Sequence, residues 1–115
     1  MILASALLAF LPAGQPPPEC DSLRDRMRDA EVRRQLQGEI RIKPAARGQW
    51  DLALFNDLER VISIDVVWKE LPMRLKRGWS PHVRDVSKGE DRGRVHGGFA
   101  ERLEPRGCVL LRVRP

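Results

Sequence analysis

The hydrophobic and polar positions divide this chain into a helical segment and a longer series of short strands, with residues 50–56 at the centre of the series. On an extended chain, Leu52 and Leu54 lie on one face and Ala53 and Phe55 on the other. A strand that is apolar on both faces is typical of an interior strand that is covered on both sides. We therefore expect the remaining strands to be arranged around residues 50–56.

Period-two alternation predicts about six strands in all, separated by turns rich in glycine, proline and polar residues. The other five segments are residues 39–43, 60–68, 81–86, 94–104 and 108–113. Residues 70–80 are interpreted as a long loop, 87–93 as a polar turn and 104–107 as a tight turn. A bulge or bend is expected at Gly97 and Gly98. Short strands at this spacing favour an all-β fold, an antiparallel Greek-key-like β-sandwich.

One helix is predicted before the strands, over residues 21–37. Ser22 is placed to cap it, Leu23 and Met27 belong to an apolar stripe, and Gly38 is placed to end it. Its alternating charges argue against a membrane-surface helix and favour one that packs on the domain or links it to a preceding segment.

Residues 1–11 are almost entirely apolar, and Pro16, Pro17 and Pro18 follow as an extended linker. The apolar run is too short to span a bilayer as a helix, so no stable membrane insertion is expected. It resembles the core of a secretory signal without the leading positive charge, so secretion is one interpretation. A short buried helix and a translation start inside a longer reading frame are the others. The chain is thus divided into a head and linker (1–20), a helix (21–38) and a sandwich (39–115).

Composition narrows the possible partners. The chain has 42% hydrophobic and 32% charged residues and a net charge of +5, but its basic residues are interleaved with acidic ones. Without a basic stripe, no nucleic-acid partner is predicted. Cys20 and Cys108 lie far apart in different kinds of sequence, so we expect neither a disulfide nor a metal site. Cys108 is interpreted as a small buried hydrophobic residue.

Candidate catalytic groups do not form a recognisable constellation, so no catalytic, cofactor-binding or metal-binding residue is assigned. His82 and His96 have no nucleophile near them in sequence. Arg84 and Asp85 are interpreted as an ion pair that closes a sheet edge. Three further acidic residues are expected to accept hydrogen bonds from backbone amides at the central strand and its turn: Asp51, Asp57 and Glu59.

Exposed tryptophans could bind sugar rings by stacking. Trp50 and Trp68 lie on predicted strands and are expected to be core or half-buried. Trp79 lies in the basic loop and is the best candidate for exposure, although a single loop tryptophan often serves as a packing residue.

An ordered series of segments resembles the C-terminal β-sandwich domain of α-galactosidases of glycoside hydrolase family 27. The hallmark is the strand that ends in Leu54-Phe55-Asn56. The other matching segments, over about two thirds of the chain, are residues 39–44, 64–71, 83–86, 94–104 and 105–113. Valine is more common in the family at the position of Cys108.

The resemblance implies a domain that packs on a catalytic (β/α)8 barrel, and the two catalytic carboxylates of such enzymes belong to the barrel. A barrel needs about 200 residues or more, so no catalytic role is transferred to any residue here. We expect a non-catalytic accessory domain, as a fragment or severed half of a glycosidase, with a barrel as its partner in the same or a separate chain. A free carbohydrate-binding module and a gene remnant without a selected role remain as alternatives. An apolar face left exposed for the barrel would make the isolated chain associate with itself.

Overall fold

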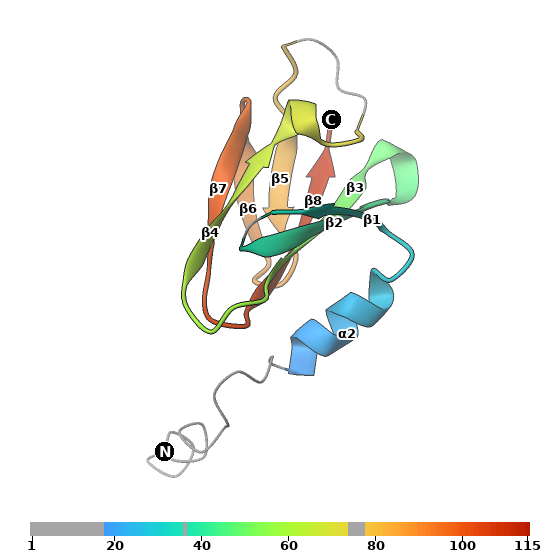
Figure 1. Cartoon of the computed structure of the whole chain (residues 1–115). Helices are drawn as coiled ribbons and strands as arrows, with labels where there is room; N and C mark the ends of the chain where they lie inside the picture. The colour runs from blue at the N-terminus through green and yellow to red at the C-terminus, as the bar shows by residue number, and fades with distance from the viewer. Residues whose placement is uncertain (1–17, 36, 74–77) are drawn as a thin grey trace, which may run out of the picture.

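The chain folds as a two-layer antiparallel β-sandwich with one helix against it (Figure 1). The structure is a computed structural model, which describes residues 18–35, 37–73 and 78–115. The elements are the helix α2 (Pro18–Arg26) and the strands β1 (Glu31–Arg34), β2 (Gly38–Pro44), β3 (Trp50–Asn56), β4 (Ile62–Val67), β5 (His82–Asp85), β6 (Glu90–Arg94), β7 (Gly98–Leu103) and β8 (Cys108–Arg114). The predicted all-β sandwich preceded by a helix is confirmed.

The two layers are very unequal in size. The large sheet has the order β1-β2-β3-β8-β5-β6, and the small sheet pairs β4 with β7. In Figure 1 the small sheet lies on one side of the large one, and α2 lies on the other. The helix and the small sheet therefore cover opposite faces of the large sheet.

Strand β3 lies inside the large sheet, as its pattern predicted. It pairs with β2 on one side and β8 on the other, and residues 52–56 are buried. Leu52 and Leu54 face the small sheet and join the main core, whereas Ala53 and Phe55 join a second cluster beneath α2. Both apolar faces of the strand are thus explained by what covers them.

The main core fills the space between the sheets. Ile62, Ile64 and Val66 of β4 alternate inward with exposed residues between them, as predicted, and they meet the inner faces of β2, β3 and β8. Burial of such side chains stabilises a fold by about 1.5–3 kcal/mol each. This core is the principal source of the free energy of folding.

The helix is much shorter than predicted, which corrects the assignment of residues 21–38. It ends at Arg26, and residues 31–34 form strand β1, which pairs antiparallel with β2 from Glu31↔Ile42 to Arg34↔Glu39. The charge pairs at helical spacing that favoured a longer helix are weak, about 0.2–0.5 kcal/mol each. Backbone pairing along the exposed edge of β2 outweighs them.

Two further segments differ from the sequence prediction. Strand β6 begins at Glu90, inside the expected polar turn, so the large sheet gains an outer strand and the strand count rises to eight within the described residues. The expected bend before β7 is present, with φ of 75° at Gly97 and 151° at Gly98. A Cβ at Gly98 would lie 2.1 Å from the carbonyl oxygen of Val66, so only glycine fits there. Within the described residues, no helix is long and apolar enough to cross a bilayer.

Candidate functional site

A disulfide joins the helix to the last strand, contrary to the sequence prediction. Cys20 of α2 and Cys108 of β8 are bonded, with Cα atoms 5.8 Å apart and a separation of 88 positions in sequence. The spacing gave no indication of this bond, because the two residues approach only when α2 crosses the outer face of the sheet. Cys108 is half-buried and acts as an anchor for the helix.

The helix covers the outer face of the large sheet with a small apolar contact. Leu23 and Met27 are buried against Ala53, Phe55 and Leu110. A helix of nine residues is too short to be stable alone in water. Its position therefore depends on this contact and on the disulfide.

Arg24 links the helix to the end of the hallmark strand. Its guanidinium lies 4.2 Å from the centre of the Phe55 ring, in the geometry of a cation–π contact. It also forms ion pairs with Glu39 at 3.3 Å and with Asp57. Because one side chain contacts β2, β3 and the turn after β3, it holds α2 in a defined orientation.

Glu39 is a buried carboxylate with several cationic partners. Its side chain is 3% exposed and pairs with Arg24, Arg34 and Arg41. Burial of a carboxylate is tolerated when it is paired in this way. The alternating pattern of β2 gave no sign that this outward-facing residue would be buried, because the covering helix was not predicted to lie there.

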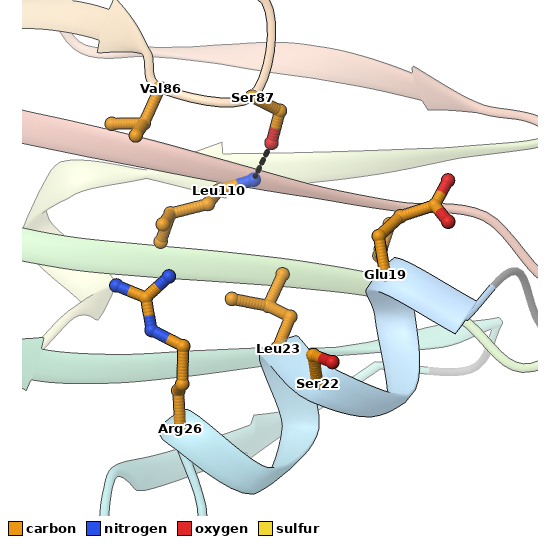
Figure 2. A pocket seen from close by; sticks show the side chains of 8 residues that line it. Glu19, Ser22, Leu23, Arg26, Val86, Ser87 and Leu110 are labelled. Carbon is orange, nitrogen blue, oxygen red and sulfur yellow. Dashed lines mark hydrogen bonds between the residues drawn. The ribbon is translucent and has the colours of Figure 1, made fainter.

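A pocket of about 520 Å³ lies between α2 and the large sheet (Figure 2). Figure 2 shows Leu23 and Arg26 extending from the helix toward the strands, and the Ser87 hydroxyl accepting a hydrogen bond from the Leu110 amide. The volume of this pocket is in the range of small-molecule sites. Its lining contains no aromatic side chain for a sugar ring to stack on: Glu19, Ser22, Leu23, Arg26, Val86, Ser87, Cys108 and Leu110.

Asn56 is a structural clamp that sequence reasoning interpreted only as a turn signal. Its buried side-chain amide donates to the carbonyl oxygens of Arg60 at 2.7 Å and Glu104 at 2.9 Å, and its Oδ1 accepts from the Leu58 amide at 2.8 Å. Its backbone amide donates to the carbonyl of Gly107. One residue thus joins the end of β3 to the start of β4 and to the turn between β7 and β8.

The expected ion pair between Arg84 and Asp85 does not exist, because successive residues of a strand point to opposite faces. Asp85 points inward, is fully buried and pairs with Arg92 at 3.1 Å. Arg92 also binds Glu101 of β7. The resulting triad joins the large sheet to the small one, and the two carboxylates raise the pKa of Arg92 above its usual value.

The other acidic candidates are separated rather than gathered into a site. Asp51 and Asp57 lie near opposite ends of β3, about 20 Å apart for a strand of this length. These two aspartates and Glu59 each form an ion pair with an arginine, whereas bonds to backbone amides were expected. The pairs are Asp51 with Arg112, Asp57 with Arg24 and Glu59 with Arg106. Carboxylates at this distance could not act together on one glycosidic bond.

The two histidines lie in different environments. His82 pairs with Asp91, whose pKa is lowered mainly by a hydrogen bond from the Gly93 amide and also by His82. His96 is exposed and contacts the Ser80 hydroxyl at 3.2 Å. Neither contact arranges a nucleophile, a base and an orienting group in one place.

The tryptophans serve mainly as packing residues. Trp68 is 3% exposed, donates its indole N–H to the Val95 carbonyl and stacks at a tilt on Phe99. Trp50 and Trp79 are partly buried against the main core. Trp79 is thus neither buried nor fully exposed, and its contact with the core fits the packing role of a loop tryptophan.

The apolar face that we expected to remain exposed is also not observed. Among the described residues, the exposed large hydrophobic side chains are Val61 and Val86, which lie singly. The outer face of the sheet is instead covered by α2 at one end and carries charged side chains at the other. The described part of the chain thus gives no apolar reason for self-association.

Fold and residue pattern together define a β-sandwich domain of a kind that occurs in glycosidases. The sequence profile of the α-galactosidase C-terminal β-sandwich domain matches residues 37–113, and the chain belongs to this family. The sequence prediction of the family is therefore confirmed. The helix and β1 lie before the matched residues, so the disulfide joins the matched domain to the segment that precedes it.

Solved structures agree with this assignment. A variant of the glycoside hydrolase family 27 β-L-arabinopyranosidase from Geobacillus stearothermophilus, in complex with arabinose, is 25% identical with a TM-score of 0.67, over 75% of this chain and 19% of that one. The α-galactosidase I from Mortierella vinacea is 18% identical with a TM-score of 0.64, over 73% of this chain and 22% of that one. The chain thus spans about one fifth of the length of these enzymes. A search of curated proteins found no match.

Proposed function

We propose that this chain is the non-catalytic accessory domain of a glycoside hydrolase family 27 enzyme, a fragment or severed half that packs with a catalytic barrel in the same or a separate polypeptide. The observation that carries the proposal is the family match over residues 37–113. The arrangement of the acidic residues supports it, since Asp51 and Asp57 are apart and each pairs with an arginine. The role of the domain is to support a barrel that supplies the chemistry.

In this proposal, the substrate is determined by the catalytic barrel and not by the sandwich. The two structural relatives described above are named for β-L-arabinopyranose and α-galactose chemistry, although both contain a sandwich of this fold. The galactoside specificity implied by the family name is therefore one of several that this domain could accompany.

A domain exchange tests the proposal. In the Geobacillus arabinopyranosidase, the sandwich that aligns with this chain would be replaced by residues 18–115, which keep α2 and the disulfide, and a truncation without any sandwich would be the matched control. We expect the exchanged enzyme to be soluble and to hydrolyse an aryl β-L-arabinopyranoside, and the truncation to be insoluble or inactive. An exchanged enzyme no better than the truncation would contradict a supporting role.

The isolated chain provides the complementary test. It should not release aryl alcohol from either an aryl α-galactoside or an aryl β-L-arabinopyranoside. Turnover that persists through purification and disappears in an Asp51→Asn or Asp85→Asn variant that still folds would overturn the non-catalytic assignment.

A free carbohydrate-binding module is the second candidate, favoured by Trp79, which is only partly buried and could stack on a sugar ring. Pull-down on galactomannan with the native chain and with Trp79→Ala distinguishes the two. Binding by the native chain that Trp79→Ala abolishes would support the module. No retention of the native chain would remove it.

The disulfide supports an exported chain. Disulfides persist in oxidising compartments and are rare in the cytosol. Together with the apolar run at residues 1–11, the Cys20–Cys108 bond favours secretion. Labelling with a thiol reagent in cells tests this: two reactive thiols in the native population would contradict export.

A further inference from the structure

The end of the outer face that α2 leaves uncovered carries a concentration of cationic side chains. His82 and Arg84 of β5 lie directly opposite Arg114 and Arg112 of β8, respectively. Alternation places all four on one face of two neighbouring strands. The four side chains therefore form a basic block that continues the surface on which the helix sits.

The pairing of Arg84 with Arg112 is unfavourable by itself. Residues directly opposite in an antiparallel pair have Cβ atoms about 4.5–5.5 Å apart, and like charges there are destabilising. The charge of Arg112 is partly compensated by Asp51, whose Oδ1 lies 2.9 Å from Nε of Arg112. Among the described residues, Arg84 and Arg114 form no ion pair, so two guanidinium groups keep their hydrogen-bond donors available.

The block surrounds a hollow of about 350 Å³. Its lining contains three arginines against a single aspartate: Gln49, His82, Arg84, Asp91, Arg112 and Arg114. Asp91 is already engaged, since its Oδ1 contacts His82 Nε2 and accepts a hydrogen bond from the Gly93 amide. The donors that face the hollow are therefore mainly guanidinium groups.

The lining also indicates the kind of ligand. The centres of protein–protein interfaces combine arginine with apolar and aromatic side chains, whereas no apolar or tryptophan, tyrosine or phenylalanine side chain lines this hollow. Guanidinium groups bind the oxygens of phosphate, sulfate and carboxylate in a two-pronged geometry. The chemistry thus matches a small oxyanion better than an apolar protein surface.

We propose that the hollow on β5 and β8 is a binding site for a tetrahedral oxyanion, a sulfate or phosphate group, held by Arg84, Arg112 and Arg114. The group is either a free ion or an ester on a larger molecule. The site is separate from the pocket beneath α2 and does not depend on the accessory role proposed above.

The experiment is isothermal titration calorimetry of the full chain with inorganic sulfate, inorganic phosphate and a sulfated galactan oligosaccharide, in buffers matched for ionic strength with NaCl. A neutral galactan oligosaccharide is the control ligand. Arg84→Gln is the test variant, since Arg84 is exposed and forms no ion pair within the described part of the chain. Arg102→Gln, which removes the same charge from exposed β7, is the matched control.

We expect saturable binding of at least one oxyanion at a single site, weakened about tenfold by Arg84→Gln and changed less than twofold by Arg102→Gln. Tighter binding of the sulfated oligosaccharide than of sulfate identifies an ester as the ligand, and equal affinities identify the free ion. Absence of saturable binding, or equal loss in both variants, would overturn the proposal, because a general surface charge would then account for any attraction.

Discussion

Cys20 and Cys108, which are 88 residues apart in sequence, form the bond that fixes helix α2 on the outer face of the sandwich. The bond connects a segment outside the matched family domain to the last strand inside it. The helix makes only a small apolar contact of its own, so this covalent link determines whether the second face of β3 stays covered.

The disulfide should contribute substantially to stability. Closure of a loop of this length in the unfolded chain corresponds to about 4–5 kcal/mol. We expect the Cys20→Ser/Cys108→Ser variant to lose that amount in urea unfolding, and reduction of the native chain to have the same effect. A native chain whose two cysteines are both alkylated without reductant would show that the bond does not form.

Covering of the outer face should keep the chain monomeric. The described residues leave only Val61 and Val86 as exposed large hydrophobic side chains. We therefore expect a monomer by light scattering under oxidising conditions. Leu23→Asp with Met27→Asp in the Cys-to-Ser background should release the helix, expose Phe55 and Leu110, and cause association. Self-association of the native oxidised chain would contradict this prediction and show that another surface mediates contacts between copies.

Asn56 should be among the polar residues most sensitive to substitution. Asn56→Ala leaves the carbonyl groups of Arg60 and Glu104 without their donor in a partly buried place, at a cost of about 2 kcal/mol. Urea unfolding measures the loss. Ser63→Ala, on the exposed face of β4, is the control and should change the free energy of unfolding by less than about 0.5 kcal/mol. Equal effects of the two changes would contradict the clamp.

The triad of Asp85, Arg92 and Glu101 should be costly to break. Arg92→Ala leaves a fully buried carboxylate unpaired, which destabilises proteins by about 3–5 kcal/mol. Arg92 is partly exposed, so we expect the lower end of that range. Arg33→Ala, which removes an exposed pair with Glu31, should cost no more than about 1 kcal/mol by the same measurement.

Asp91 should contribute to an acid-dependent part of the stability. Its pKa lies below the ordinary value of 3.8, mainly because the Gly93 amide donates to it and also because of His82. A lowered pKa means that the ionised carboxylate favours the folded state: the contribution is present above about pH 4 and is lost as the pH falls through the folded pKa. As the pH is lowered from 6 to 3, the urea concentration at the midpoint of unfolding should therefore fall less steeply for Asp91→Asn than for the native chain. Identical slopes would contradict this contribution.

The sequence by itself determined the sandwich, the position of β3 and the family. These features rest on local alternation and on an ordered series of segments, which can be recognised without knowing which segments pack together. Leu52 and Leu54, for example, point inward because side chains alternate along any strand. The same alternation should have excluded a pair between Arg84 and Asp85, which was predicted from adjacency alone.

Only the tertiary structure decided what covers each face and which distant side chains meet. Residues 31–34 form a strand because the free edge of β2 is available to them, and Asp85 finds Arg92 because β6 lies beside β5. Cys20 reaches Cys108, and Arg24 reaches Phe55, only because the helix crosses the outer face of the sheet. Such contacts join residues far apart in sequence, and no local pattern encodes them because their energy exists only once the sheet has formed.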